Sequence, residues 1–168
     1  MAFIALMSAM PMTSCSNDDP VTDPTENPDG NGSEQGEKIE LKGTVEGTMT
    51  LDAKNEYTLT GSLVVPEGAV LEIPAGTVIK AQKGFDKYIL VARGGKIEAK
   101  GTAEKPIVFT ADTDDAGQGY WGGLVINGRA PISGAAAGTE GATEIDNNQK
   151  YGGTDAADNS GTLTYVKL

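Results

Sequence analysis

The sequence predicts an all-β fold built as a solenoid, and three observations support that prediction. Between residues 39 and 51, apolar side chains fall on alternate positions, namely Ile39, Leu41, Val45, Met49 and Leu51. The same odd-numbered series continues with Tyr57, Leu59, Leu63 and Val65. A period of two is typical of extended chain with one buried and one solvated face. No later stretch of the chain has a helical period.

Two segments, residues 63–73 and 89–99, repeat the same order of strand and glycine-containing turn. The repeat aligns Val65 with Val91, Gly68 with Gly94, Leu71 with Ile97 and Glu72 with Glu98, each 26 positions apart. A weaker third copy, residues 123–132, places Gly128 34 positions after Gly94, so the extra residues are expected in the polar loop 112–119. A period in the twenties is typical of one coil of a β-solenoid. The alternative is a β-sandwich in which Asn127-Gly128 forms a type I′ hairpin turn.

Composition excludes several kinds of site. The chain has 24 acidic and 13 basic residues and a net charge of -11, which argues against nucleic acid as a partner. It contains no histidine, so a Ser-His-Asp triad and a histidine-ligated metal are excluded, and its single cysteine excludes an internal disulfide. Residues 16–37 hold seven of the acids, no base and three prolines. They are expected to form a disordered tether.

The start of the chain predicts a targeting segment. Residues 1–12 are apolar but too short to span a bilayer, and small residues follow just before Cys15. Met12-Thr13-Ser14-Cys15 resembles a bacterial lipobox, and residues 16–19 resemble the acidic export signal of Bacteroidetes surface lipoproteins. The resemblance implies lipidation of Cys15. It departs from the usual pattern in Met12 and in the absence of an upstream base, which suggests a truncated start; the alternative is a buried structural cysteine.

Three later segments resemble one family of bacterial surface proteins. Residues 71–79 (LEIPAGTVI), 101–110 (GTAEKPIVFT) and 121–131 (WGGLVINGRAP) are similar to pectin-lyase-like domains with right-handed parallel β-helices, common among Bacteroidetes lipoproteins. The resemblance covers about residues 57–168. It implies a right-handed parallel β-helix and supplies no catalytic residues. The expected organisation is a signal peptide at 1–14, a lipidated cysteine and acidic linker at 15–37, and the β-helix at 38–168.

The last eight residues, Gly161–Leu168, have the pattern of a strand with no polar closing element after it. A solenoid needs a cap over its last coil, because an open end exposes unpaired strands. We therefore expect the chain to be an N-terminal fragment of a longer β-helix.

Carboxylates and arginines give the candidate sites for an enzyme. Glu72 and Glu98 are one repeat apart and would stack on adjacent coils, so they could form an acid/base pair, although an outward-facing surface ladder is favoured. Asp112, Asp114 and Asp115 form the tightest acidic cluster and are the candidate calcium ligands, with a solvated loop as the favoured alternative. Arg93 and Arg129 occupy equivalent turns, where a lyase would place its base.

Tyr120 and Trp121 form a candidate platform for stacking on a sugar, with Arg129 as a further candidate ligand contact. Packing of Trp121 against Gly122-Gly123 is the favoured alternative. We expect a lipid-anchored protein of the bacterial outer membrane, exposed at the cell surface, with a non-catalytic role in binding, adhesion or display and a polysaccharide as candidate ligand. A polysaccharide lyase or glycoside hydrolase fragment is the alternative, and a structural spacer is the third. No cofactor other than calcium is expected.

Overall fold

β-strands make up the regular structure of residues 36–168, the part of the chain that the computed structural model describes. Its strands are β1 (Lys38–Thr44), β2 (Thr48–Thr50), β3 (Glu56–Val65), β4 (Val70–Pro74), β5 (Val78–Ala81), β6 (Gly84–Val91), β7 (Lys96–Lys100), β8 (Ile107–Ala111), β9 (Trp121–Ile126), β10 (Glu140–Thr143), β11 (Asp146–Gly152), β12 (Gly161–Thr164) and β13 (Val166–Lys167). No helix able to span a bilayer is found in this range. The predicted signal segment, Cys15 and nearly all of the tether lie outside it.

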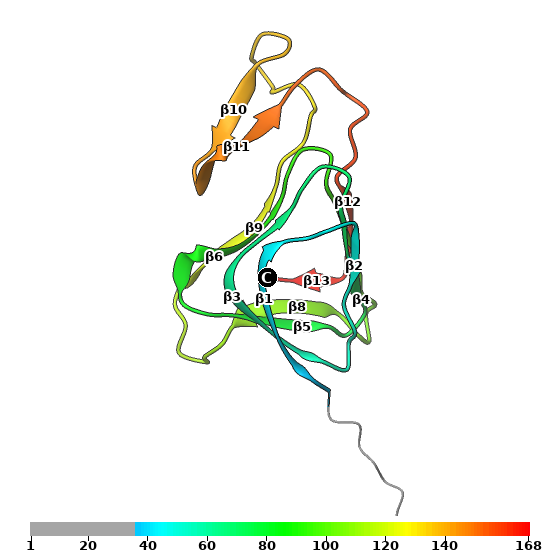
Figure 1. The fold of residues 1–168 in the computed structure, drawn as a ribbon, viewed down its shortest axis with the longest axis vertical. Helices are drawn as coiled ribbons and strands as arrows, with labels where there is room; N and C mark the ends of the chain where they lie inside the picture. The colour runs from blue at the N-terminus through cyan, green and yellow to red at the C-terminus, as the bar shows by residue number, and fades with distance from the viewer. Residues whose placement is uncertain (1–35) are drawn as a thin grey trace, which may run out of the picture. The chain divides into compact units, whose positions relative to one another are not determined.

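The strands wind around three faces of a coil that is roughly triangular in Figure 1. One face is the parallel sheet β2-β4-β7-β12. The other two belong to a single bent sheet, because β3 runs around a corner: Tyr57–Leu59 pair with β5, whereas Leu63–Val65 pair with β6. The β-sandwich alternative is wrong, since every pair in both sheets is parallel.

Strand register confirms the 26-residue repeat. Val65 lies opposite Val91, and on the next face Leu71 and Glu72 lie opposite Ile97 and Glu98. The backbone N–H of Gly68 donates to the carbonyl of Gly94 over 3.0 Å, so the turns stack as well. Parallel strands at a constant offset place like residues in columns, which is what makes the sequence repeat readable.

The third copy follows a register one residue away from the predicted one. Val91 pairs with Ile126, 35 positions later, and the backbone N–H of Asn127 donates to the Val91 carbonyl over 2.8 Å. Asn127 therefore continues the parallel ladder and does not form a hairpin turn. The predicted insertion at 112–119 is also only part of the difference, because Val78 pairs with Val108, so four extra residues already precede β8. A one-residue slip would exchange the two faces of β9.

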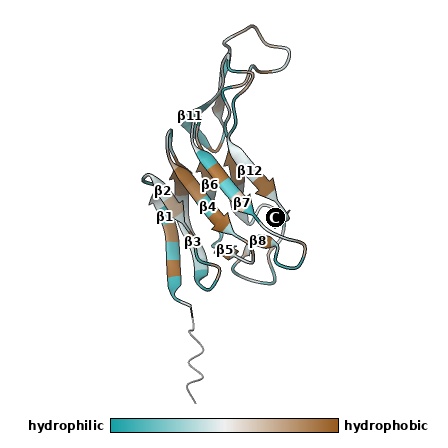
Figure 2. Ribbon diagram, turned by 90° about the vertical axis from the view of Figure 1, so that its right-hand side faces the viewer, coloured by the Kyte–Doolittle hydropathy of each residue, from teal (hydrophilic) through white to brown (hydrophobic). Residues whose placement is uncertain are grey.

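The odd-numbered apolar residues fill the interior of the coil, as their alternation predicts. Figure 2 shows the alternating bands along β1 and β7. The odd-numbered side chains that are buried most completely come from successive coils: Val45, Leu59, Leu63, Val65, Leu71, Ile73, Ile79, Ile89, Val91, Ile97 and Ile107. Ile39 and Met49 pack against this core but are only partly buried. Thr77 is a fully buried polar residue, and its hydroxyl is satisfied because it donates to the Pro74 carbonyl over 2.7 Å.

A long excursion interrupts the fourth coil between β9 and β12. It contains the antiparallel hairpin β10–β11, which projects from one corner of the coil in Figure 1. After the excursion the chain rejoins the two parallel sheets, since Gly161 pairs with Ile97 and Val166 pairs with Ile107. The hairpin is the feature that creates a cavity on an otherwise regular surface.

Candidate functional site

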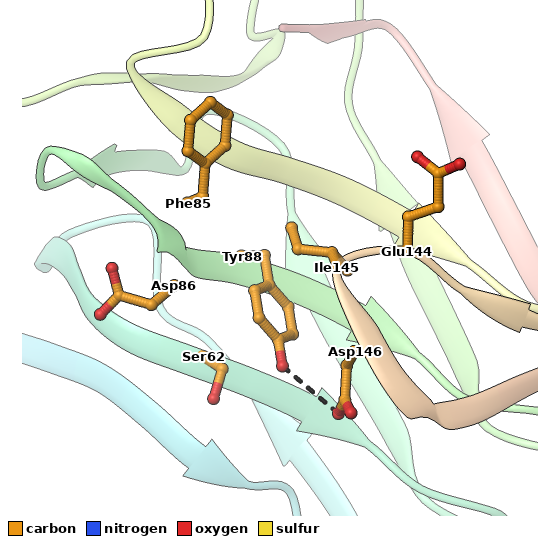
Figure 3. Close-up of a pocket in the computed structure, with 7 residues that line it drawn as sticks. All are labelled: Ser62, Phe85, Asp86, Tyr88, Glu144, Ile145 and Asp146. Atoms are coloured by element: carbon orange, nitrogen blue, oxygen red, sulfur yellow. Dashed lines mark hydrogen bonds between the residues drawn. The ribbon is translucent and has the colours of Figure 1, made fainter.

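A cavity of about 730 Å³ lies between the outer surface of the coil and the turn of the β10–β11 hairpin. Its lining residues are Ser62 on β3, Phe85, Asp86 and Tyr88 on β6, and Glu144, Ile145 and Asp146 at the hairpin turn. Figure 3 shows the Tyr88 ring between Asp86 and Asp146, with Ser62 beside it, whereas the Glu144 side chain points away from Tyr88. Its volume is within the roughly 300–1,000 Å³ typical of ligand sites.

The hairpin turn is seated on β9 by a glycine. A Cβ atom at Gly122 would lie 2.5 Å from the backbone carbonyl oxygen of Phe85 and 2.7 Å from Cδ1 of Ile145, so glycine permits the close approach of β9 to β6 and also leaves room for Ile145. Polar contacts add to this seat. The side-chain amide of Asn127 donates to Oγ1 of Thr143 over 2.7 Å, and the Tyr88 hydroxyl donates to Asp146 over 3.5 Å. Leu90, an outward residue of β6, is fully buried on this side of the coil.

Ion pairs hold the base of the hairpin to the turns of the coil. Arg93 contacts the Glu140 carboxylate and also donates to the Gly152 carbonyl over 3.1 Å. The hydrogen bond from Arg93 and its positive charge lower the pKa of Glu140. Arg129 lies 2.5 Å from Glu67, and its backbone N–H donates to Asp158 over 2.7 Å. The two arginines that sequence places in equivalent turns thus line one polar cavity of about 350 Å³.

The lowered pKa of Glu140 predicts a pH-dependent contribution to stability. A group with a lowered folded pKa contributes stability above its ordinary pKa, here 4.5, and loses it as the pH falls through the lowered value. We expect Glu140→Gln to lower the Tm above pH 4.5 and the difference from wild type to shrink below that pH. Thermal unfolding followed by circular dichroism measures it. Glu144→Gln is the control, because Glu144 is an exposed carboxylate of the same hairpin that forms no ion pair within residues 36–168, and its Tm difference from wild type should not change with pH. A Tm difference for Glu140→Gln that stays constant across pH 4.5 would contradict the stabilising role of the Arg93–Glu140 pair.

The cavity offers an apolar wall beside hydrogen-bonding groups. Phe85 is 70% exposed although it is a large aromatic residue, and Tyr88 is nearly buried beneath the hairpin. Asp146 keeps its carboxylate at the cavity, where Oδ1 accepts a hydrogen bond from the backbone N–H of Asn148 over 3.0 Å. An aromatic face covers the C–H surface of a sugar ring, while carboxylates and hydroxyls bind its hydroxyl groups. The arrangement therefore suits a carbohydrate.

Tyr120 and Trp121 do not line this cavity, although they lie beside its Phe85 end: Gly84 pairs with Trp121, and the backbone N–H of Gly84 donates to the Tyr120 carbonyl over 2.9 Å. The hydroxyl of Tyr120 donates to Asp112 over 2.7 Å, and that bond raises the pKa of the tyrosine. Trp121 is half-buried and packs against the core of the coil, as the packing alternative predicts. A ligand contact by either residue stays a prediction.

Asp112, Asp114 and Asp115 lie on the exposed loop between β8 and β9. Within residues 36–168, no three or more His, Cys, Asp or Glu residues form a group that could hold a metal ion. Arg129, the third predicted ligand contact, has its guanidinium engaged by Glu67, which raises its pKa. Calcium binding and a ligand contact by Arg129 stay predictions.

Glu72 and Glu98 do stack on adjacent coils, as their spacing predicts. They line a shallow hollow of about 220 Å³ on the outer surface of the β2-β4-β7-β12 sheet. Thr50 donates to Glu72 over 2.8 Å, and Nζ of Lys100 lies 2.8 Å from Oε2 of Glu98, outside regular hydrogen-bond geometry. The Lys100 ammonium lowers the pKa of Glu98. A general acid needs a raised pKa, so Glu98 is unsuited to that role.

Sequence reasoning missed all seven residues of the cavity beside the hairpin. Phe85 was the available signal, because it is an odd-numbered aromatic residue that the alternation would place inside the coil, yet it follows Gly84 in a polar stretch. The hairpin residues carried a second signal, the run Glu144-Ile145-Asp146, in which one apolar residue stands between two acids. Neither signal indicates that the two segments meet.

Comparison with known proteins gives one match. A family model described as a pectate-lyase like beta helix domain matches residues 43–168, which is most of the chain and includes the hairpin and every residue of the cavity. No curated protein and no solved structure matches the chain.

Proposed function

Because the chain belongs to the family of pectate-lyase-like β-helix domains, we propose that it binds a polysaccharide, without cleaving it, in the cavity beside the β10–β11 hairpin. The single observation that carries the proposal is the cavity itself, in which an exposed aromatic side chain stands beside carboxylates. An aromatic side chain at the rim of a cavity offers a flat apolar face on which a sugar ring can stack.

The test is to titrate the protein with soluble neutral glucan, mannan and galactan oligosaccharides by calorimetry. We expect saturable binding of at least one of them and no new reducing ends or unsaturated products after prolonged incubation. Phe85→Ala should weaken that binding by about tenfold, the effect of losing one aromatic contact of about 1.4 kcal/mol, and Phe85→Tyr should retain it. Since Phe85 is largely exposed, the Tm should hardly change. Equal binding by Phe85→Ala and wild type would contradict the site.

A carbohydrate-active enzyme is the second candidate, and one observation favours it: Arg93 and Arg129 meet in one cavity. A lyase base must be able to lose its proton, but Glu67 raises the pKa of Arg129. Both guanidinium groups are also held by carboxylates. These contacts support a structural role for the pair, and the product assay above distinguishes the two candidates.

The proposal extends to the cellular location of the protein and to the handedness of its coil. Lipidation of Cys15 would anchor the domain in the bacterial outer membrane, where an acidic linker would hold the cavity away from the surface and suit adhesion or display. Anchoring by several acyl chains is stable, because each buried CH₂ contributes about 0.8 kcal/mol. The coil is proposed to be right-handed, the hand that parallel β crossovers overwhelmingly adopt.

A further inference from the structure

The side chains that line the cavity carry negative charge and no positive charge. Three of the seven are carboxylates, Asp86, Glu144 and Asp146, and none is lysine or arginine. Lys87 follows Asp86 on β6, and its Nζ lies 2.5 Å from that carboxylate. It neutralises one of the three acids. Glu144 and Asp146 have no ion-pair partner within the described part of the chain.

The two remaining charges stand on either side of Ile145, the residue that seats the hairpin. Packing of Ile145 therefore positions the backbone that carries both charges, while the exposed Glu144 side chain points away from Tyr88 (Figure 3). Asp146 is further fixed by hydrogen bonds from Tyr88 and from the Asn148 backbone. A fixed charge at a partly enclosed surface acts on a ligand more strongly than a mobile charge in water.

The positive groups near the hairpin are engaged elsewhere. Arg93 and Arg129 line the separate polar cavity, where Glu140 and Glu67 pair with them. A saccharide in the cavity beside Tyr88 thus meets two carboxylates, Glu144 and Asp146, with which no lysine or arginine of residues 36–168 forms an ion pair. A polyuronate, which carries a carboxylate on every sugar, would be repelled by these side chains. The hydroxyl groups of a neutral saccharide would instead donate hydrogen bonds to the carboxylate oxygens of the protein.

We propose that this cavity selects saccharides without carboxylates, favours amine-bearing ones, and rejects polyuronates of the pectate type. The inference rests on the proposed function, since it specifies the ligand class of the same site. It also separates this chain from the polyuronate that the description of its family suggests. The residues responsible for selection are Glu144 and Asp146.

The test compares ligands that share one backbone and differ only in charge. Oligogalacturonides and oligomannuronides are used as they are, after reduction of each carboxylate to a hydroxymethyl group, and after conversion to an aminoethyl amide. Affinities are measured by calorimetry in EDTA, so that no calcium bridges the carboxylates, and at two salt concentrations. We expect the reduced chains to bind about tenfold more tightly than the uronates, and the amides to bind most tightly at low salt.

The variants Glu144→Gln and Asp146→Asn retain size while removing charge. Each should decrease the ratio of neutral to uronate affinity and flatten the salt dependence for the amides. Glu46→Gln, an exposed carboxylate that does not line the cavity, should leave the ratio unchanged. Uronates that bind as tightly as their reduced forms would overturn the charge selection and leave saccharide binding standing. Failure of all three forms to bind would overturn both.

Discussion

Replacing Ile97 by aspartate is expected to unfold the β-helix. Ile97 is 1% exposed and lies in the middle of the β2-β4-β7-β12 sheet, opposite Leu71 on one side and Gly161 on the other. A carboxylate there would be buried without a partner, and the stacked coils leave no route for it to reach water. The expected loss exceeds about 4 kcal/mol, a large share of the stability of a domain of this size.

Urea unfolding followed by far-ultraviolet circular dichroism measures this loss. Lys96→Asp is the matched control, because it introduces the same residue on the same strand one position away, on the exposed surface. It should change the free energy of unfolding by less than about 1 kcal/mol. Ile97→Ala should give an intermediate loss of about 2–5 kcal/mol. An Ile97→Asp protein as stable as the Lys96→Asp protein would mean that the side chain at position 97 does not lie in the core.

Replacing Ser62 by tryptophan is expected to abolish saccharide binding. Ser62 lies on β3 beside the Tyr88 ring and contributes one of the smallest side chains of the cavity lining, so an indole at this position would occupy space that the ligand needs (Figure 3). Because Ser62 faces the cavity and not the interior of the coil, the core should be unaffected. Binding of the neutral oligosaccharides should fall below detection.

Calorimetry of the Ser62 variants, with the Tm recorded for each, checks the expectation. Ser62→Ala leaves the cavity open and should bind like wild type, and Ser62→Leu should show a partial loss. If Ser62→Trp folds and still binds with wild-type affinity, the ligand occupies another surface.

The regular coils were predictable because their information is local and periodic. Alternation assigns each side chain of β3 and β7 to a face, and a constant offset of 26 aligns Val65 with Val91 and Leu71 with Ile97. The prediction fails where insertions enter the chain. The register of the third copy is wrong by one residue, and four of the extra residues precede β8 and do not lie at 112–119. A short loop carries no period, so its residues cannot be counted into one coil or the next.

The cavity could not be predicted, because long-range packing creates it. Ile145 reaches Gly122 across 23 positions of chain, and nothing in the polar hairpin sequence specifies where its turn will lie. The predicted contacts Tyr120, Trp121 and Arg129 follow from aromatic residue type and from turns that the repeat makes equivalent. Trp121 packs on the core, as its packing alternative predicts, and Arg129 pairs with Glu67, while a ligand contact by these residues stays a prediction.

Saccharide binding beside the hairpin is the central claim, and mapping the bound ligand on the protein tests it most directly. Backbone amide resonances of residues 36–168 would be followed by NMR while the neutral oligosaccharide that binds most tightly is added. The account predicts the largest shifts at Ser62, at Phe85–Tyr88 and at Glu144–Asp146, the three segments that line this cavity. Shifts centred on the Glu72 and Glu98 ladder, on another face of the coil, would contradict it.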